Sequence, residues 1–288
     1  MLETRWTLRG MDFAGLTWPG TGPLTLLLHG FLDHAGAWEG VAAGLPGPLV
    51  ALDHRGHGRS AHNPRGASYL FADYVADVDA LVDLLSPNDP VRLVGHSMGG
   101  TIASLYAGAR PSRVASLVSI DGLGIPDGVD SPMMAGGDPV SERMVKFLDG
   151  AKRLPERRAM PSVEAAAERL ASTNTMSGPA WARRLAERGT VPVEGGVTWS
   201  FDPAHKTRSP VPYRHGHHVP LLRRITCPVL ALHPSAGTFA DDDIAVLEAA
   251  IPRFERATVP GTGHAMHQEA PALIAQAICA FWANNPSS

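Results

Sequence analysis

Short apolar runs alternate along the chain with longer stretches whose apolar residues recur every three or four positions. The runs are Leu24–Leu28, Leu49–Leu52, Val91–Val94, Val114–Ile120, Val229–Leu232 and Arg256–Val259. Continuous apolar runs of this length are typical of strands that are covered on both faces of a parallel sheet. The periodic stretches predict helices over Ala72–Leu85, Met98–Arg110, Asp243–Ile251 and Pro271–Asn284. This alternation predicts an α/β fold with right-handed crossovers.

Two segments depart from that rhythm. The opening residues around Trp6 and Phe13 predict an antiparallel hairpin at the edge of the sheet. Residues 122–222 contain no buried-strand run, and their helical patches lie near 141–154, 163–173 and 180–188. The sequence therefore predicts a mostly parallel eight-stranded sheet with helices on both faces. The core comprises residues 1–121 and 223–288, and residues 122–222 form a helical cap inserted after the sixth strand.

The composition of the chain limits the kinds of partner that it is expected to bind and the cellular compartment in which it is expected to work. The formal net charge of −3 favours neither nucleic acid nor an anionic membrane surface. No apolar run approaches the roughly 18 residues of a membrane span, and the first ten residues, MLETRWTLRG, lack the apolar core of a secretory signal. The two cysteines, Cys227 and Cys279, lie in apolar stretches and are interpreted as buried thiols. We therefore expect a cytoplasmic protein; the sequence does not define its oligomeric state.

The clearest chemical signal is the segment Gly95-His96-Ser97-Met98-Gly99, which lies between a predicted strand and a predicted helix. In that context the pattern G-x-S-x-G predicts a sharp turn that raises the serine hydroxyl above the sheet. The flanking glycines relieve the crowding that a strained backbone would otherwise cause there. Ser97 is therefore the candidate nucleophile, at the N-terminus of a helix whose dipole favours negative charge.

A serine nucleophile needs a base and an oxyanion site. His264 follows the last strand, and loops after parallel strands meet at the edge of the sheet where the serine turn lies. We therefore expect His264 to be the base, with His267 as the weaker candidate. The backbone N–H groups of Met98 and Phe31 are the expected oxyanion donors, because Gly30 allows the loop after Leu24–Leu28 to approach.

Four segments together resemble the α/β-hydrolase family: LLLHGFLDHAGAW (26–38), ALDHRGHGRS (51–60), VGHSMGG (94–100) and VPGTGHAMHQEAP (259–271). The resemblance implies that 53–60 is a structural loop, in which Asp53 and Arg55 tie loops together and His54 and His57 are scaffold rather than metal ligands. Within the family, residues 197–232 resemble the serine hydrolase-like subgroup.

The acid of the triad is the residue that the pattern leaves open. Relatives usually carry an aspartate a few residues after the strand Val229–Leu232, but that position falls here at Ala236 or Gly237. In haloalkane dehalogenase-like relatives the acid lies 24 residues after the nucleophile, and Asp121 stands at that place after Ser97. We therefore predict Ser97–Asp121–His264. The alternative is an aspartate of the group Asp241, Asp242 and Asp243, whose other interpretation is as the cap of a helix.

The expected activity is hydrolysis of carboxylic esters of small or medium acyl groups, with the ester and water as partners and without a metal or organic cofactor. The alternatives are a C–C bond hydrolase or lactonase that uses the same triad, and a receptor that keeps the fold without catalysis. A serine nucleophile argues against dehalogenase or epoxide hydrolase chemistry, for which relatives carry aspartate. Substrate contacts stay undefined, with cap side chains as candidates: Met133, Met134, Met144 and Phe147. The cap histidines are expected on a surface loop rather than around zinc: His205, His215, His217 and His218.

Overall fold

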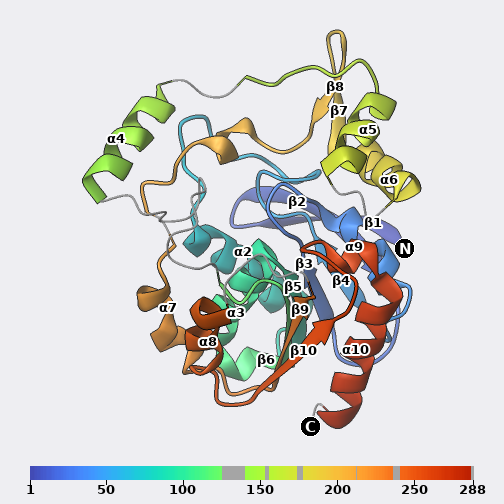
Figure 1. Ribbon diagram of the computed structural model, residues 1–288, viewed down its shortest axis with the longest axis vertical. Helices are drawn as coiled ribbons and strands as arrows, with labels where there is room; N and C mark the ends of the chain where they lie inside the picture. The colour runs from blue at the N-terminus through green and yellow to red at the C-terminus, as the bar shows by residue number, and fades with distance from the viewer. Residues whose placement is uncertain (125–139, 153–155, 174–177, 212, 236–240, 287–288) are drawn as a thin grey trace.

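A single mixed sheet of eight strands organises the chain in the computed structural model, which describes residues 1–124, 140–152, 156–173, 178–211, 213–235 and 241–286 (Figure 1). Its strand order is β1-β2-β4-β3-β5-β6-β9-β10. The strands are β1 (Leu2–Leu8), β2 (Met11–Trp18), β3 (Thr25–Leu28), β4 (Leu49–Leu52), β5 (Val91–His96), β6 (Val114–Ile120), β9 (Val229–Pro234) and β10 (Phe254–Val259). Strands β1, β2 and β4 pair antiparallel, and the remaining pairs are parallel.

The apolar runs form the central strands because each strand is buried on both faces. Leu26 and Leu28 of β3 belong to one core, whereas Leu27 between them belongs to the other. This alternation follows from the two-residue period of a strand. The predicted mostly parallel eight-stranded sheet with helices on both faces is therefore confirmed, including the antiparallel hairpin at its edge.

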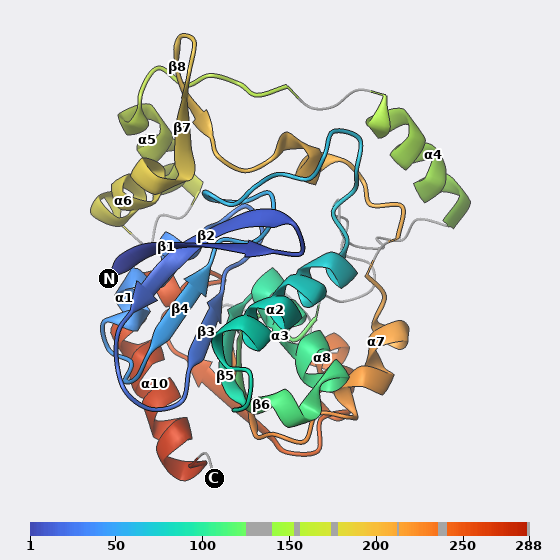
Figure 2. The same cartoon turned by 180° about the vertical axis from the view of Figure 1, so that it is seen from behind.

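Helices cover both faces of the sheet. One core is completed by α2 (Phe71–Leu85), α3 (Met98–Ala109), α7 (His215–Leu222) and α8 (Asp241–Glu248); Figure 2 shows α2 and α3 on the near side. The other core is completed by η1 (Ala35–Trp38), α1 (Glu39–Ala42), α9 (Met266–Glu269) and α10 (Pro271–Asn284). A short 3₁₀ turn, η2 (Pro111–Arg113), leads from α3 into β6.

The segment between β6 and β9 lies over one end of the sheet (Figure 1). It contains α4 (Val140–Ala151), α5 (Val163–Thr173), α6 (Pro179–Gly189), β7 (Thr190–Val193), β8 (Gly196–Trp199) and η3 (Pro203–Lys206), followed by α7. The three helical patches predicted there are present. This segment, called the insert below, also contains a hairpin that the predicted helical cap did not include, because β7 and β8 pair antiparallel.

Two further expectations about side-chain placement need correction. The cap histidines do not share a surface loop: His205 lies in η3 and is buried, and His217 and His218 lie in α7. Of the two cysteines, Cys227 is buried, but Cys279 is partly exposed on α10. Met133 and Met134 lie outside the described residues, as do the side chains of His215 and of residues 241–244.

No described helix has both the length and the apolar character that crossing a bilayer requires.

Candidate active site

Ser97 occupies the turn between β5 and α3 in the strained conformation that the glycine pattern predicts. Its φ is +50° and its ψ is −117°, a combination that non-glycine residues rarely adopt. The Ser97 N–H donates a hydrogen bond to the Ile120 carbonyl on β6 (3.0 Å). A Cβ atom at position 99 would lie 2.0 Å from the Leu28 carbonyl oxygen, so only glycine allows α3 to start this close to β3.

Asp121 and His264 meet at the same edge of the sheet. Asp121 follows β6 directly, and its N–H donates to the Leu232 carbonyl of β9 (2.9 Å). His264 lies in the loop after β10, and its Nδ1 is 2.5 Å from Asp121 Oδ2. The carboxylate is buried and the imidazole is 42% exposed. A charge-assisted bond of this length fixes the ring with Nδ1 toward the acid and leaves Nε2 for a partner.

Among the described residues, the remaining contact of the predicted triad, from the serine hydroxyl to the imidazole, is not formed. Within the described ranges, no hydrogen bond joins Ser97 Oγ to His264. His96, the residue before Ser97, nevertheless donates from Nε2 to the His264 carbonyl (2.9 Å). Catalytic hydrogen bonds are often long in ligand-free enzymes and tighten when substrate binds. The structure therefore brings Asp121 and His264 into direct contact. Ser97 is connected to this pair only through the hydrogen bond of the adjacent residue, His96.

The alternative acids lie at the start of a helix. Residues 241–243 form the first turn of α8, where carboxylates are expected on electrostatic grounds, and their side chains lie outside the described set. Asp121 is thus the acid whose contact with His264 is defined.

The two expected oxyanion donors belong to segments that meet at Ser97. Met98 is the first residue of α3, a position whose N–H has no partner inside the helix. Phe31 follows Gly30, where a Cβ atom would fall 2.8 Å from His96 Nδ1 and 3.3 Å from Ser97 Cβ. The loop after β3 therefore reaches the nucleophile turn, as the sequence predicts, and Gly30 is what permits the approach.

A cluster of buried histidines packs against the loop after β3. The His29 Nδ1–H donates to the Gly30 carbonyl (2.7 Å), and its Nε2 accepts from the His54 N–H (3.0 Å). Burial lowers the pKa of His54 to about 3 and the pKa of His57 to about 4. Burial likewise lowers the pKa of His29 and of His205. These imidazoles are therefore neutral at neutral pH.

The loop after β4 has the contacts expected of a structural tie. Asp53 accepts from the N–H groups of Ala35 (2.6 Å) and Arg59 (3.0 Å). Arg55 forms a two-bond pair with the buried carboxylate of Asp77 on α2, at 2.5 Å for each bond. This geometry connects the loops around the candidate site to the sheet and to α2.

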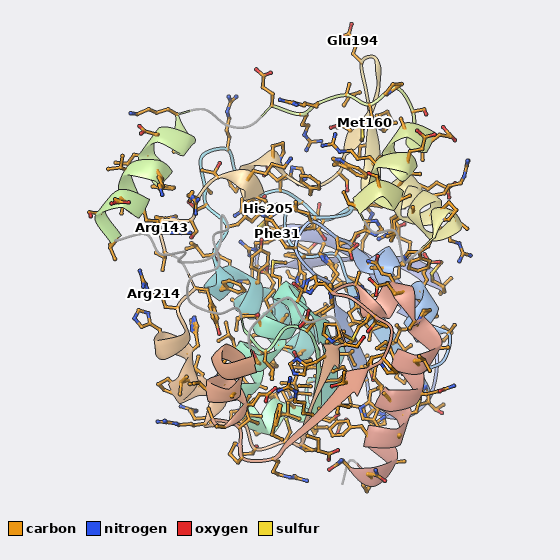
Figure 3. The ribbon with its side chains drawn as sticks, in the orientation of Figure 1. Phe31, Arg143, Met160, Glu194, His205 and Arg214 are labelled. Atoms are coloured by element: carbon orange, nitrogen blue, oxygen red, sulfur yellow. The ribbon has the colours of Figure 1, made fainter. Side chains whose placement is uncertain are left out.

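The insert contacts the core through groups that the sequence did not single out. Arg188 of α6 reaches Asp53 (Nη2 to Oδ2, 2.6 Å) and Glu3 (Nη1 to Oε2, 3.1 Å). The His34 Nε2–H donates to the Leu185 carbonyl of α6 (3.0 Å). His205 lies over the Phe31 ring, with centroids 5.9 Å apart (Figure 3). The sequence around Arg188 does not indicate that this side chain pairs with Asp53 and Glu3, which are distant in the chain.

A cavity of about 240 Å³ lies at this junction between the insert and the core. Its lining includes Leu32 and Asp33 from the loop after β3, Leu185 from α6, and Trp199, Phe201 and Lys206 from the segment after β7. Of the expected cap contacts, Met144 is exposed, and Phe147 lines a separate small cavity beside His205. The cavity of about 240 Å³ therefore borders Leu32, the residue after the expected oxyanion donor Phe31.

One group of side chains has the chemistry and spacing of metal ligands. Asp33, His96 and His267 each offer one donor atom, and these three atoms lie within 4.8 Å of one another. Burial, and the neighbouring His267 and His264, lower the pKa of His96, so this imidazole is neutral.

An α/β sheet with a strained serine turn and an aspartate–histidine pair at its carboxyl edge defines a class of hydrolases. The chain matches a family model described as "alpha/beta hydrolase fold" over residues 23–271, and it belongs to that family. The match covers the core strands from β3 to β10 together with the insert.

Relatives and solved structures agree with this assignment. A serine hydrolase-like protein of Danio rerio is 32% identical over 66% of this chain, which spans 59% of that relative's length. A probable serine hydrolase of Drosophila melanogaster is 28% identical, and the match covers 89% of this chain and 80% of that relative's length. The thioesterase domain from the curacin biosynthetic pathway superposes with a TM-score of 0.86 at 28% identity, covering 97% of this chain and 99% of the domain. These likenesses support a hydrolase.

Proposed function

We propose that the chain is a serine hydrolase that cleaves carboxylic esters of small or medium acyl groups through an acyl-enzyme. The observation that carries the proposal is the 2.5 Å contact between His264 Nδ1 and the buried Asp121 carboxylate, beside the strained turn at Ser97. In this reading the cap is residues 122–222, and the core is residues 1–121 and 223–288.

The first half of the reaction forms the acyl-enzyme. His264 Nε2 takes the proton of the Ser97 hydroxyl as Oγ bonds to the ester carbonyl carbon. Asp121 holds the imidazole and stabilises its positive charge. The N–H groups of Phe31 and Met98 stabilise the oxyanion, and the leaving alcohol takes the proton from His264 as the ester C–O bond breaks.

The second half releases the acid. His264 takes a proton from a water molecule, whose oxygen attacks the acyl carbon, and returns that proton to Ser97 Oγ as the acyl–serine bond breaks. The cavity beside Leu32 supports binding of the rest of the substrate between insert and core, because it lies next to the proposed oxyanion loop.

The test is labelling by a fluorophosphonate probe combined with a p-nitrophenyl ester series from acetate to decanoate. We expect the purified chain to be labelled at Ser97 and to hydrolyse the esters, with activity falling as the acyl chain lengthens. Ser97→Ala should lose both properties while keeping its fold. A folded wild-type chain that is neither labelled nor active would overturn the proposal and favour the receptor alternative.

A second candidate function is hydrolysis of thioesters, which the likeness to the curacin thioesterase domain favours. The same serine, histidine and oxyanion donors serve this reaction, because only the leaving atom changes from oxygen to sulfur. An oxygen ester and a thioester of the same acyl group distinguish the candidates: kcat/KM is higher for the preferred leaving group.

A further inference from the structure

Three metal-type donors come together beside the proposed nucleophile from separate parts of the chain. Asp33 lies in the same loop as Phe31, His96 ends β5 immediately before Ser97, and His267 lies in α9. One nitrogen of each ring and one carboxylate oxygen all lie within 4.8 Å of one another. None of the three has a role in the acyl-transfer chemistry proposed above.

The imidazoles of His96 and His267 are buried, which distinguishes this group of donors from a chance cluster of side chains on the surface. Both rings are buried, and their centroids are 4.0 Å apart. Nδ1 of His96 and Nδ1 of His267 have no hydrogen-bond partner among the described residues. Buried polar atoms usually have a partner, so the unpaired Nδ1 of His96 is free for a further interaction. His267 turns its other nitrogen, Nε2, toward Asp33 (3.9 Å).

The amide of Gln268 bridges part of the group in this structure. Its Nε2 lies 2.8 Å from Asp33 Oδ2 and 3.4 Å from His267 Nε2. His267 Nε2 and Asp33 Oδ2 are themselves 3.9 Å apart. Two ligands about 2.0–2.2 Å from a tetrahedral zinc ion are roughly 3.3–3.5 Å apart. A modest approach of Asp33, with the Gln268 amide turned away, would therefore bring this pair to the spacing of zinc ligands. The three donor atoms together span up to 4.8 Å, so His96 must also move toward the ion.

The donor set selects the kind of ion. Two imidazoles and one carboxylate suit Zn²⁺, Cu²⁺, Ni²⁺ or Co²⁺, whereas Mg²⁺ and Ca²⁺ prefer oxygen ligands. Three protein ligands leave one position of a tetrahedron for water. Asp33 is partly exposed, with 16% of its side chain accessible, which gives the ion a route from solvent.

We propose that Asp33, His96 and His267 bind a divalent transition-metal ion, and that this ion inhibits the hydrolase. The inhibitory half rests on the proposed function, whereas binding does not. His96 donates from Nε2 to the His264 carbonyl (2.9 Å), and its Nδ1 faces Gly30 of the oxyanion loop. An ion that draws His96 toward Asp33 therefore displaces the His264 loop, the oxyanion loop or both.

Binding is measured on the full chain after treatment with EDTA, by calorimetry with Zn²⁺ and by electron paramagnetic resonance with Cu²⁺. We expect one ion per chain for each metal, nitrogen couplings in the copper spectrum, and no binding of Mg²⁺. Asp33→Asn and His267→Gln should each weaken Zn²⁺ binding at least ~10-fold. Asp33→Asn retains an oxygen for the His34 N–H that Asp33 now accepts (2.8 Å), so its fold is preserved.

Two controls separate this site from other histidines. His217→Gln removes an exposed imidazole of α7 and should leave the affinity unchanged. His264→Gln removes the proposed catalytic base, whose partly exposed ring is the obvious competing ligand. Loss of Zn²⁺ binding in His264→Gln, together with full binding in Asp33→Asn, overturns the proposal.

Inhibition is tested separately with the best p-nitrophenyl ester. Zn²⁺ should lower turnover of the wild-type chain, EDTA should restore it, and the inhibition constant should rise in Asp33→Asn by the same factor as the dissociation constant. An inhibition constant unchanged in Asp33→Asn refutes the inhibitory half. Zn²⁺ binding by Ser97→Ala distinguishes an absent metal site from an absent esterase activity, because that variant keeps all three ligands.

Discussion

Asp121 combines two unusual properties at one residue. Its φ is +45°, which is rare for a residue with a side chain, and its carboxylate is buried against His264. Ser97 likewise has a positive φ, and Gly122 packs directly against the Ser97 backbone. Strained residues of this kind persist where surrounding contacts hold them, commonly at functional sites. The strain at both residues agrees with the roles proposed for them.

Replacing Asp121 by asparagine tests its role as the acid. We expect Asp121→Asn to lower kcat by about 10⁴, because the amide no longer favours the productive imidazole tautomer or stabilises the imidazolium. Steady-state kinetics on the best ester measures the effect, and Asp241→Asn is the matched control. Near-normal turnover in Asp121→Asn, with loss in Asp241→Asn, would move the role to α8.

Residue-level prediction from the sequence worked where geometry is local and was limited where it depends on distant partners. The glycines around Ser97 predict the turn by themselves. The contact of Asp121 with His264 was expected from the resemblance to haloalkane dehalogenase-like relatives, whose acid lies 24 residues after the nucleophile. His96 stood inside the same motif, but nothing nearby in the sequence indicated Asp33 or His267 as its neighbours. The burial of His205 also depends on Phe31 and Tyr69, more than 130 residues away in the chain.

At the scale of elements, α6 is tied to the core by buried polar contacts. The buried Arg188 guanidinium neutralises the fully buried Asp53 carboxylate, and His34 binds the Leu185 carbonyl one turn earlier. A buried pair contributes little net free energy when intact, but removing one partner leaves an unpaired charge in the interior. The pair therefore enforces the position of α6 relative to the β4 loop.

Replacing Arg188 by methionine tests how much the pair of Arg188 and Asp53 matters for stability. We expect Arg188→Met to lower the free energy of unfolding by about 3–5 kcal/mol, because Asp53 would keep its charge without its partner. Urea denaturation measures the change. Arg183→Met on the same helix is the control; its side chain is exposed beside Glu187, so a loss below ~1 kcal/mol is expected. Equal losses in the two variants would contradict a special role for Arg188.

The helices of the insert were predictable from periodicity, whereas its hairpin was not. Val191 and Val193 of β7 flank Pro192, and proline inside a short run argues against a strand. The available signal was the glycine pair Gly195-Gly196, both with positive φ, between two valine- and threonine-containing runs. Four-residue strands in a two-stranded sheet carry too little apolar pattern to be distinguished from a loop.

At the scale of the whole molecule, buried neutral histidines make stability depend on pH. His29, His54 and His57 belong to the core loops, and His205 comes from the insert. Burial lowers the pKa of each below the value of about 6.5 for an unfolded chain. The unfolded chain therefore binds more protons below that pH, so their contribution is complete above about 6.5 and is lost as the pH falls.

We expect the free energy of unfolding to fall on acidification between pH 6.5 and 4.5. Each histidine that stays neutral only in the folded chain contributes about 1.4 kcal/mol per pH unit in that window. Urea unfolding at several pH values measures the slope. His54→Phe tests its origin, because neither ring nitrogen of His54 has a hydrogen-bond partner among the described residues. The variant should reduce the slope by one histidine's share, and an unchanged slope would rule out His54 as a source.

The uneven attachment of the insert restricts how a substrate can enter. Helix α6 is fastened through Arg188, whereas α4 at the other end presents Val140, Val145 and Leu148 to solvent. If the insert moves during the proposed reaction, we expect α6 to move least, because Arg188 and Leu185 bind core residues, and α4 to move most. Bulky acyl groups would then be admitted from the α4 side, and a crosslink between α4 and the core would restrict the size of ester accepted while leaving turnover of acetate esters intact.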